Sequence, residues 1–232
     1  MDYKFSHKNG ESGLEEKLFK HGLVVARNVI DKQLAMETGE IILKYFKKLT
    51  EKHGFFDCEN NSNCMSFMRS IESLPEIQSR LSEISKSQSL LNLLEKLLGP
   101  DISTNLHNSI MINDPEDTSQ VTNKKLHQEY WTGQVSDDLS VWAPLTQVDD
   151  KNTLYVVPGS HFYGILPNRN RELLPIDGFE VGEGLPLSNL GPGDVVIFHF
   201  LLLHGTAGRS QNRRVAMVRY YKPTFTETSM SL

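Results

Sequence analysis

Residues 191–221 have the sequence GPGDVVIFHFLLLHGTAGRSQNRRVAMVRYY, and this stretch decides the fold. A Gly-Pro-Gly-Asp turn is followed by a β-branched and aromatic run at 195–203. A polar Ser-Gln-Asn segment then precedes a second run at 213–221. Short apolar runs bounded by Gly, Pro, Asn and Asp are typical of β-strands joined by turns. We therefore predict two strands connected by a loop.

Similar short runs occupy the chain between Pro100 and that stretch. They are rich in strand-forming residues and lie at about 104–113, 126–131, 139–145 and 154–157. Several short strands with turns between them indicate a sandwich or jelly roll rather than a parallel α/β sheet. We predict a mainly β fold whose core spans about 101–222.

Helical spacing dominates the earlier part of the chain. An apolar run at 22–30 favours a strand, and Asp31 after it is a good helix N-cap. Apolar residues then recur at helical spacing over 34–49, and a second leucine-rich helix is expected at roughly 82–98. These flanking helices, mostly within 31–98, would cover one outer face of the β core.

Length and charge suggest one domain without an extended basic surface. A chain of 232 residues is long enough for one sizeable core and short for two, so 1–232 is expected to be a single domain. The net charge of -5 argues against a nucleic-acid partner, because phosphate backbones are bound by clustered Lys and Arg. Short basic pairs such as Lys47-Lys48 and Lys124-Lys125 lie more often on a solvent-exposed face than in a binding site for a partner.

No segment of the sequence suggests export or membrane insertion. The first ten residues lack the apolar stretch of a secretory signal, and no window approaches the roughly 20 apolar residues of a membrane span. We expect a cytoplasmic protein that acts on a small-molecule substrate, with no membrane partner. Cys58 and Cys64 are expected to be free thiols. The oligomeric state is left open by the sequence.

The triplet His127-Gln128-Glu129 carries the first chemical signal. In a strand, His127 and Glu129 would project from the same face, whereas on a helix positions two apart diverge. His204 follows the apolar run at 195–203. Two His and one carboxylate on one face of a metal leave its other positions open, as in the facial triad of non-haem Fe(II) oxygenases. Arg213, at the start of the next run, could clamp a carboxylate with two parallel hydrogen bonds.

Each of these signals has an ordinary structural explanation. An H-x-E triplet occurs by chance, a single His at a strand end is more often structural, and a basic pair after a polar loop usually faces solvent. His199 would face away from His204 in an unbroken strand, and His161 is expected to be a turn residue. His107 is equally a substrate contact or a core histidine.

The order of the motifs makes the chain similar to a known family from about residue 22 to residue 221. IMINDPED at 110–117 is followed by a polar loop and LHQE, then by DLSVWAPL at 138–145 and KNTLYVVPGSH at 151–161. Together with the stretch at 191–221, this series resembles the phytanoyl-CoA dioxygenase family. The resemblance implies a double-stranded β-helix, a jelly roll of the cupin-like kind.

The resemblance also implies an enzyme that uses Fe(II), 2-oxoglutarate and O2 to hydroxylate a small metabolite, with release of succinate and CO2. His127, Glu129 and His204 would bind the iron and form the catalytic centre. The distal carboxylate of 2-oxoglutarate would be held by Arg213, with Arg214 as its competitor. Further co-substrate contacts are implied at Trp142, Thr206, Ile110 and Arg69.

Two departures from the family pattern affect the expected chemistry. The usual carboxylate ligand is Asp, and Glu129 is one methylene longer. Because the carboxylate is retained, hydroxylation is favoured over halogenation, for which the halogenating relatives replace it with a small residue. The common Asn-Gly turn is Asn152-Thr153 here.

The sequence leaves the substrate open among acyl thioesters, sugars, amino acids and peptide-derived metabolites. We expect the residues that contact the substrate to lie near the opening of the metal site. The candidates are Arg69, Asn105, His107, Tyr130, Trp131 and Gln134. The alternative function is a catalytically inactive jelly-roll protein that binds a metal or ligand. A metal-dependent isomerase without a co-substrate is a third possibility, and it would leave Arg213 without a role.

Overall fold

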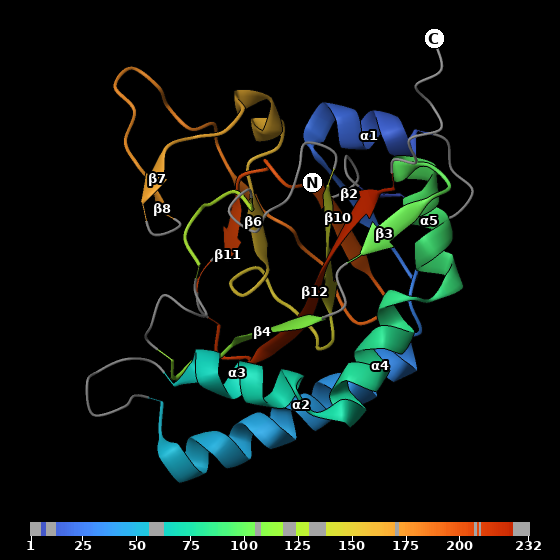
Figure 1. Cartoon of the computed structure of the whole chain (residues 1–232). Helices are drawn as coiled ribbons and strands as arrows, with labels where there is room; N and C mark the ends of the chain where they lie inside the picture. Colours follow the sequence, from blue (N-terminus) through green and yellow to red (C-terminus); the bar gives the residue numbers. More distant parts are fainter. Residues whose placement is uncertain are drawn as a thin grey trace.

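The computed structural model describes residues 6–7, 13–55, 63–104, 108–117, 124–129, 138–169, 172–206, 208 and 210–224. Among them, a seven-stranded sheet (the main sheet) has the order β1-β2-β10-β5-β12-β3, and β4 also pairs with β12 (Figure 1). Its strands are β1 (Ser6–His7), β2 (Leu23–Ala26), β3 (Ile102–Thr104), β4 (Ser109–Asn113), β5 (Leu139–Pro144), β10 (Val195–His199) and β12 (Arg214–Pro223). Apart from the β1–β2 pair, its strands pair antiparallel.

A second, smaller sheet has the strand order β11-β6-β9. It consists of β6 (Leu154–Val156), β9 (Leu185–Pro186) and β11 (His204–Thr206). Strands β7 (Asn168–Arg169) and β8 (Glu172–Leu173) pair antiparallel in a separate two-stranded sheet. Trp142, Val196 and Phe198 of the main sheet pack with Leu154 and Val156 of this small sheet in one apolar cluster. The two sheets therefore enclose a shared interior.

Helices cover the other face of the main sheet (Figure 1). They are α1 (Leu14–His21), α2 (Lys32–His53), α3 (Cys64–Glu72), α4 (Pro75–Ser85) and α5 (Gln88–Leu98), and a 3-10 helix, η3, spans Ser160–Tyr163. The Asp31 side chain caps α2 by accepting a hydrogen bond from Leu34 N at 2.7 Å. In the middle of α2, a Cβ on Gly39 would lie 2.3 Å from the carbonyl oxygen of Leu145, so only glycine allows this close packing on the sheet.

Strict alternation along the strands separates the two faces of the main sheet. In β12, Val215 and Met217 pack in the helical core, whereas Ala216 packs in the cluster between the sheets. The same holds in β10, where Val195 and Ile197 face the helices. The predicted fold, mainly β with flanking helices in a jelly-roll arrangement, is confirmed.

Several predicted boundaries were wrong. The expected helix at roughly 82–98 is two helices, α4 and α5, and α3 was missed altogether. The run at 195–203 is not one strand, because β10 ends at His199 and the chain turns, with Leu202 N donating to His199 O at 2.9 Å. This turn moves His204 out of the main sheet and into the small one. The predicted strand at 126–131 contributes, among its described residues, one isolated bridge between His127 and His204.

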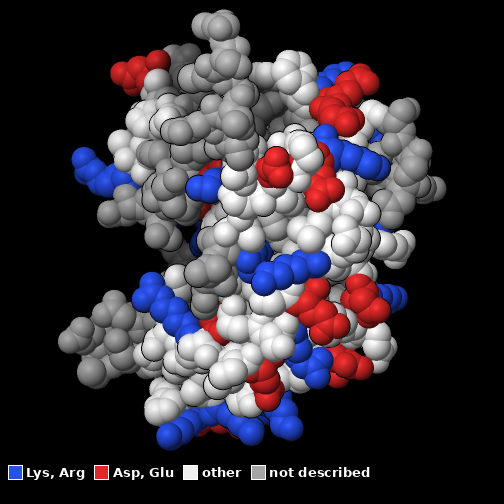
Figure 2. Space-filling view, turned by 45° about the vertical axis from the view of Figure 1, so that its right-hand side comes forward, with Lys and Arg blue, Asp and Glu red and all other residues white. Residues whose placement is uncertain are grey.

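On the face in Figure 2, acidic and basic side chains of the described residues are interspersed. Among the described residues, no helix has the length and apolar character that a bilayer crossing requires. Cys64 is buried at the start of α3 and forms no disulfide among the described residues, and Cys58 lies outside the described residues.

Candidate metal centre

His127 and His204 lie directly opposite each other on neighbouring extended segments. His127 N donates to His204 O at 2.9 Å, and His204 N donates to His127 O at 3.1 Å. Such a doubly bonded antiparallel pair places both side chains on one face. The imidazole centroids are 4.3 Å apart. The backbone alone therefore aligns the two histidines.

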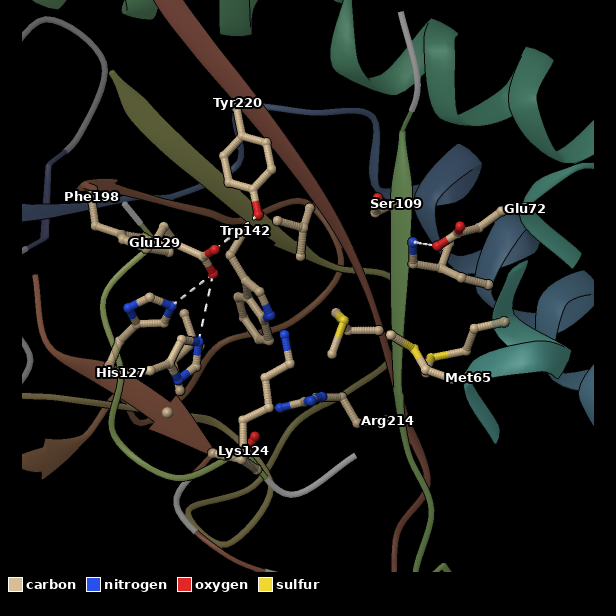
Figure 3. Close-up of a pocket in the computed structure, with 18 of the residues that line it drawn as sticks. Met65, Glu72, Ser109, Lys124, His127, Glu129, Trp142, Phe198, Arg214 and Tyr220 are labelled. Carbon is tan, nitrogen blue, oxygen red and sulfur yellow. Dashed lines mark hydrogen bonds and ion pairs between the residues drawn. The ribbon is translucent and has the colours of Figure 1, made fainter. Parts of the chain in front are cut away.

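Glu129 completes a group of three potential ligands. Its Oε1 lies 3.3 Å from His204 Nε2 and 3.6 Å from His127 Nε2 (Figure 3). One ligand atom from each residue lies within 4.8 Å of the others, and all three residues are buried. Glu129 N donates to Phe200 O at 2.8 Å, which holds the carboxylate on the same side as His127. The three residues could hold a metal ion.

The Nδ1 atom of each imidazole already makes a hydrogen bond with the backbone. His127 Nδ1 lies 2.6 Å from the carbonyl oxygen of Lys125, and His204 Nδ1 lies 2.9 Å from that of Leu202. A carbonyl only accepts, so each Nδ1 carries the proton and each Nε2 presents its lone pair to the centre. This is the arrangement in which outer hydrogen bonds orient metal-bound histidines.

The protonation states also suit a cation. Burial, together with the neighbouring His204, lowers the pKa of His127 from 6.5 to about 4. Burial alone would raise the pKa of the Glu129 carboxyl, but its contacts with His127 and His204 outweigh burial and hold the pKa well below 4.5. A neutral imidazole and an ionised carboxylate are the forms that bind metal. Two nitrogens and one carboxylate oxygen also fit the donor set that Fe(II) takes in oxygenases.

Two further residues, which the sequence did not single out, hold Glu129 in place. The hydroxyl of Tyr220 donates to Glu129 Oε2 at 3.2 Å, so that Oε1 is the oxygen turned to the histidines. Gln128 points away from the centre, and its amide donates to Gly164 O at 2.8 Å and Leu201 O at 2.9 Å. Its oxygen accepts from Leu166 N at 2.9 Å. A glutamine between two expected ligands was the only sequence signal for this anchor.

The three candidate ligands open into a pocket of about 240 Å³ between the two sheets and α3 (Figure 3). Its apolar wall comes from Met65 and Met68 of α3, Met111, Leu154, Phe198 and Val218. The predicted co-substrate contacts Trp142, Thr206, Ile110 and Arg69 also line it, from four different elements. The structure therefore gathers these residues around one cavity.

The two adjacent arginines have the opposite orientation from the one expected. Arg213 does not line the pocket; it pairs with Asp114, and its guanidinium carbon lies 5.8 Å from the ring of Phe46 in α2. Arg214 lines the pocket, donates to Asn152 O, and lies 5.5 Å from the Trp142 ring. The reason is the register of β12, whose even-numbered residues face the pocket.

The other histidines that were considered lie elsewhere. His161 belongs to η3, donates from Nε2 to Phe19 O at 2.9 Å, and has its ring 5.4 Å from that of His199. Neither lines the pocket. The predicted substrate residues Asn105, His107, Tyr130, Trp131 and Gln134 all lie outside the described residues.

Comparison with known proteins gives one family and one fold. The family model described as phytanoyl-CoA dioxygenase matches residues 19–216. A probable phytanoyl-CoA dioxygenase of Caenorhabditis elegans is 26% identical over 156 residues, which are 61% of this chain and 50% of that protein. The chain thus spans about half the length of this curated relative.

Solved structures with the same fold include two non-haem enzymes. The non-heme monooxygenase ThoJ, in its apo form, has a TM-score of 0.67 at 19% identity, over 90% of this chain and 76% of its own. The epimerase SnoN, in complex with Fe3+, alpha ketoglutarate and nogalamycin RO, has a TM-score of 0.65 at 12% identity. The match covers 94% of this chain and 86% of the SnoN chain. At these identities the likeness shows the fold alone.

Proposed function

Because the chain belongs to the phytanoyl-CoA dioxygenase family, we propose that it is an Fe(II)- and 2-oxoglutarate-dependent dioxygenase that hydroxylates a small-molecule metabolite. The observation that carries this proposal is the convergence of His127, Glu129 and His204 on one buried point. The fold neighbour SnoN was solved with iron and alpha ketoglutarate, which supports the same pair here. The intact ligand set argues against the inactive alternative.

The roles of the three ligands follow from their hydrogen bonds. His127 and His204 would bind the iron through Nε2, and Glu129 would bind it through Oε1. When bound, iron and 2-oxoglutarate supply the O2-dependent oxidation, with succinate and CO2 as co-products. The carbonyls of Lys125 and Leu202 keep the imidazoles in the required tautomer, and Tyr220 steadies the carboxylate.

Arg214 is the residue that we assign to the distal carboxylate of the co-substrate. It is 2% exposed, and burial lowers its pKa from 12.5 to about 10, so the guanidinium stays charged at neutral pH. Its planar fork matches a carboxylate with two parallel hydrogen bonds. Trp142 flanks the guanidinium, and Thr206 lines the same pocket.

The pocket wall gives the primary substrate an apolar surface next to the metal centre. Met65, Met68 and Met111 contribute flexible, polarisable side chains that adapt to irregular shapes. The cavity of about 240 Å³ has to hold the co-substrate as well, which favours a substrate whose oxidised part is small. This supports a small molecule, or one end of a larger one, as the substrate.

Substitutions at Glu129 test the proposal. Glu129→Gln should lower both metal content and substrate-dependent succinate formation by at least about tenfold, because a neutral amide is a poorer ligand for Fe(II) than a carboxylate. Glu129→Asp should retain part of the activity, since charge and ligand type survive. Metal analysis of the folded protein and a metabolite screen for succinate above the uncoupled background are the measurements.

Glu40→Gln, which makes the same chemical change on the exposed surface of α2, is the matched control and should behave as wild type. If folded Glu129→Gln keeps full metal content and turnover, Glu129 is not a ligand and the proposed function fails.

A further inference from the structure

Lys124 occupies a position that the sequence did not suggest. Its neighbour Lys125 is exposed, as expected for a solvated basic pair. Lys124 instead lines the pocket, together with the three ligands and Arg214. Figure 3 shows its side chain reaching into the cavity, with the amine end beside the Trp142 ring. One member of this lysine pair is therefore part of the pocket.

The backbone at Lys124 is held against the strand that carries His204. Thr206 N donates to Lys124 O at 2.8 Å. Between them, a Cβ on Gly205 would lie 2.7 Å from that same carbonyl oxygen, so glycine is needed for the close approach. Lys124 thus lies beside Thr206, and both residues line the pocket that Arg214 also lines.

Two cationic side chains in the wall of one small cavity indicate an anionic ligand. Arg214 comes from β12 and Lys124 from the segment before His127, and both point into the space beside Trp142 (Figure 3). Two like charges in a partly desolvated space repel each other. An anion bound between them attracts both, and this attraction outweighs the repulsion. Apart from the candidate metal ligands, the other charged residues in the wall are Arg69 and Glu72, which both belong to α3 and have opposite charges.

We propose that Lys124 is a second cationic contact of the 2-oxoglutarate carboxylate that Arg214 holds. The inference rests on the proposed function and names a residue beyond the arginine. An arginine binds one edge of a carboxylate with its fork, which leaves the oxygen lone pairs on the other side free for a lysine point charge. Lys124 would thereby raise the affinity for an oxo-dicarboxylic acid over an oxo-monocarboxylic acid.

Binding to metal-loaded protein without O2 tests this directly. Calorimetric titration of the Mn(II)-loaded protein with 2-oxoglutarate should show about tenfold weaker binding for Lys124→Met, the loss expected for one charged hydrogen bond. The second ligand is 2-oxovalerate, which keeps the 2-oxo acid group and lacks the distal carboxylate. Its affinity should be the same in the wild type and in Lys124→Met.

Lys44→Met removes an exposed lysine of α2 and should bind both ligands as the wild type does. Equal affinities of Lys124→Met and wild type for 2-oxoglutarate would overturn the inference while leaving the proposed function intact. An equal loss of affinity for both ligands would also overturn it, because Lys124 would then act on the 2-oxo acid group that the two ligands share and not on the distal carboxylate. If the Mn(II)-loaded wild type does not bind 2-oxoglutarate, the proposed function itself fails. Thermal unfolding of each variant verifies that it is folded.

Discussion

Strand β12 carries a buried arginine on each of its two faces, and the two have different surroundings. Arg219 faces the helices, and its guanidinium donates to the side chains of Thr104 and Asn108. Arg214 faces the pocket and donates to Asn152 O, but its Nε has no hydrogen-bond partner among the described residues. Each is 2% exposed.

This difference separates an arginine that stabilises the fold, Arg219, from the arginine that we propose binds the co-substrate, Arg214. Burial lowers the pKa of both guanidinium groups, to about 10 for Arg214. A buried cation is tolerated when hydrogen bonds compensate for the lost water, as they do at Arg219. At Arg214 a buried donor remains without a partner beside a cavity. Such a group costs stability in the free protein, and a bound carboxylate would recover the cost.

The largest expected effect is on co-substrate binding by Arg214→Met. Removing a buried guanidinium that holds a carboxylate should weaken 2-oxoglutarate binding by about 100-fold or more, because a charged hydrogen bond is lost and its partner stays desolvated. The unfolding free energy of the ligand-free protein should be unchanged or higher, since an incompletely satisfied buried charge is removed. Calorimetry and urea unfolding give the two values.

Arg213→Met is the matched control for that experiment. Arg213 is partly exposed and pairs with Asp114 on the α2 side, so its loss should change 2-oxoglutarate affinity by less than about threefold. If Arg213→Met abolishes binding and Arg214→Met does not, the assignment of the two faces of β12 is reversed.

Arg219→Met should give the opposite result. It leaves the oxygens of Thr104 and Asn108 without their buried donor, so we expect a loss of roughly 3 kcal/mol in unfolding free energy. The affinity for 2-oxoglutarate of the protein that remains folded should stay within about threefold of wild type. If Arg219→Met and the wild type have the same unfolding free energy, Arg219 does not stabilise the fold, and the two faces of β12 do not differ as stated.

A smaller effect is expected from the pocket-side His127 when the pH is lowered. Its pKa is 6.5 in the unfolded chain and about 4 in the folded protein. Between these values the unfolded chain binds a proton that the folded protein does not, so stability falls as the pH drops. From pH 7 to pH 5, this residue should cost the metal-free protein roughly 2 kcal/mol of unfolding free energy.

His127→Asn should remove that part of the pH dependence, measured by urea unfolding at pH 7 and pH 5. His53→Asn, at an exposed site in α2, is the control and should keep the wild-type pH dependence. The same loss of stability in His127→Asn and wild type would show that His127 is not held neutral by burial.

Local spacing explains why the sequence could point to the candidate metal ligands. His127 and Glu129 are two residues apart in extended backbone, and this places their side chains on one face whatever the rest of the chain does. The turn chemistry after Pro100 likewise predicted short antiparallel strands and thus the jelly roll. Helix α3 was missed, and with it the contribution of Met65 and Met68 to the pocket wall, because the polar segment before Cys64 shows no helical period; Arg69 was the one α3 residue expected at the site.

The sequence by itself determined the fold class and the three candidate metal ligands, since both depend on patterns within a few residues. Only the tertiary structure decided that Arg214 rather than Arg213 faces the pocket, and that Lys124 joins it. The register of β12 is set by its pairing with β4 and β5, far away in sequence. A shift of one residue in that register turns every side chain to the other face, so no local pattern could have made the choice.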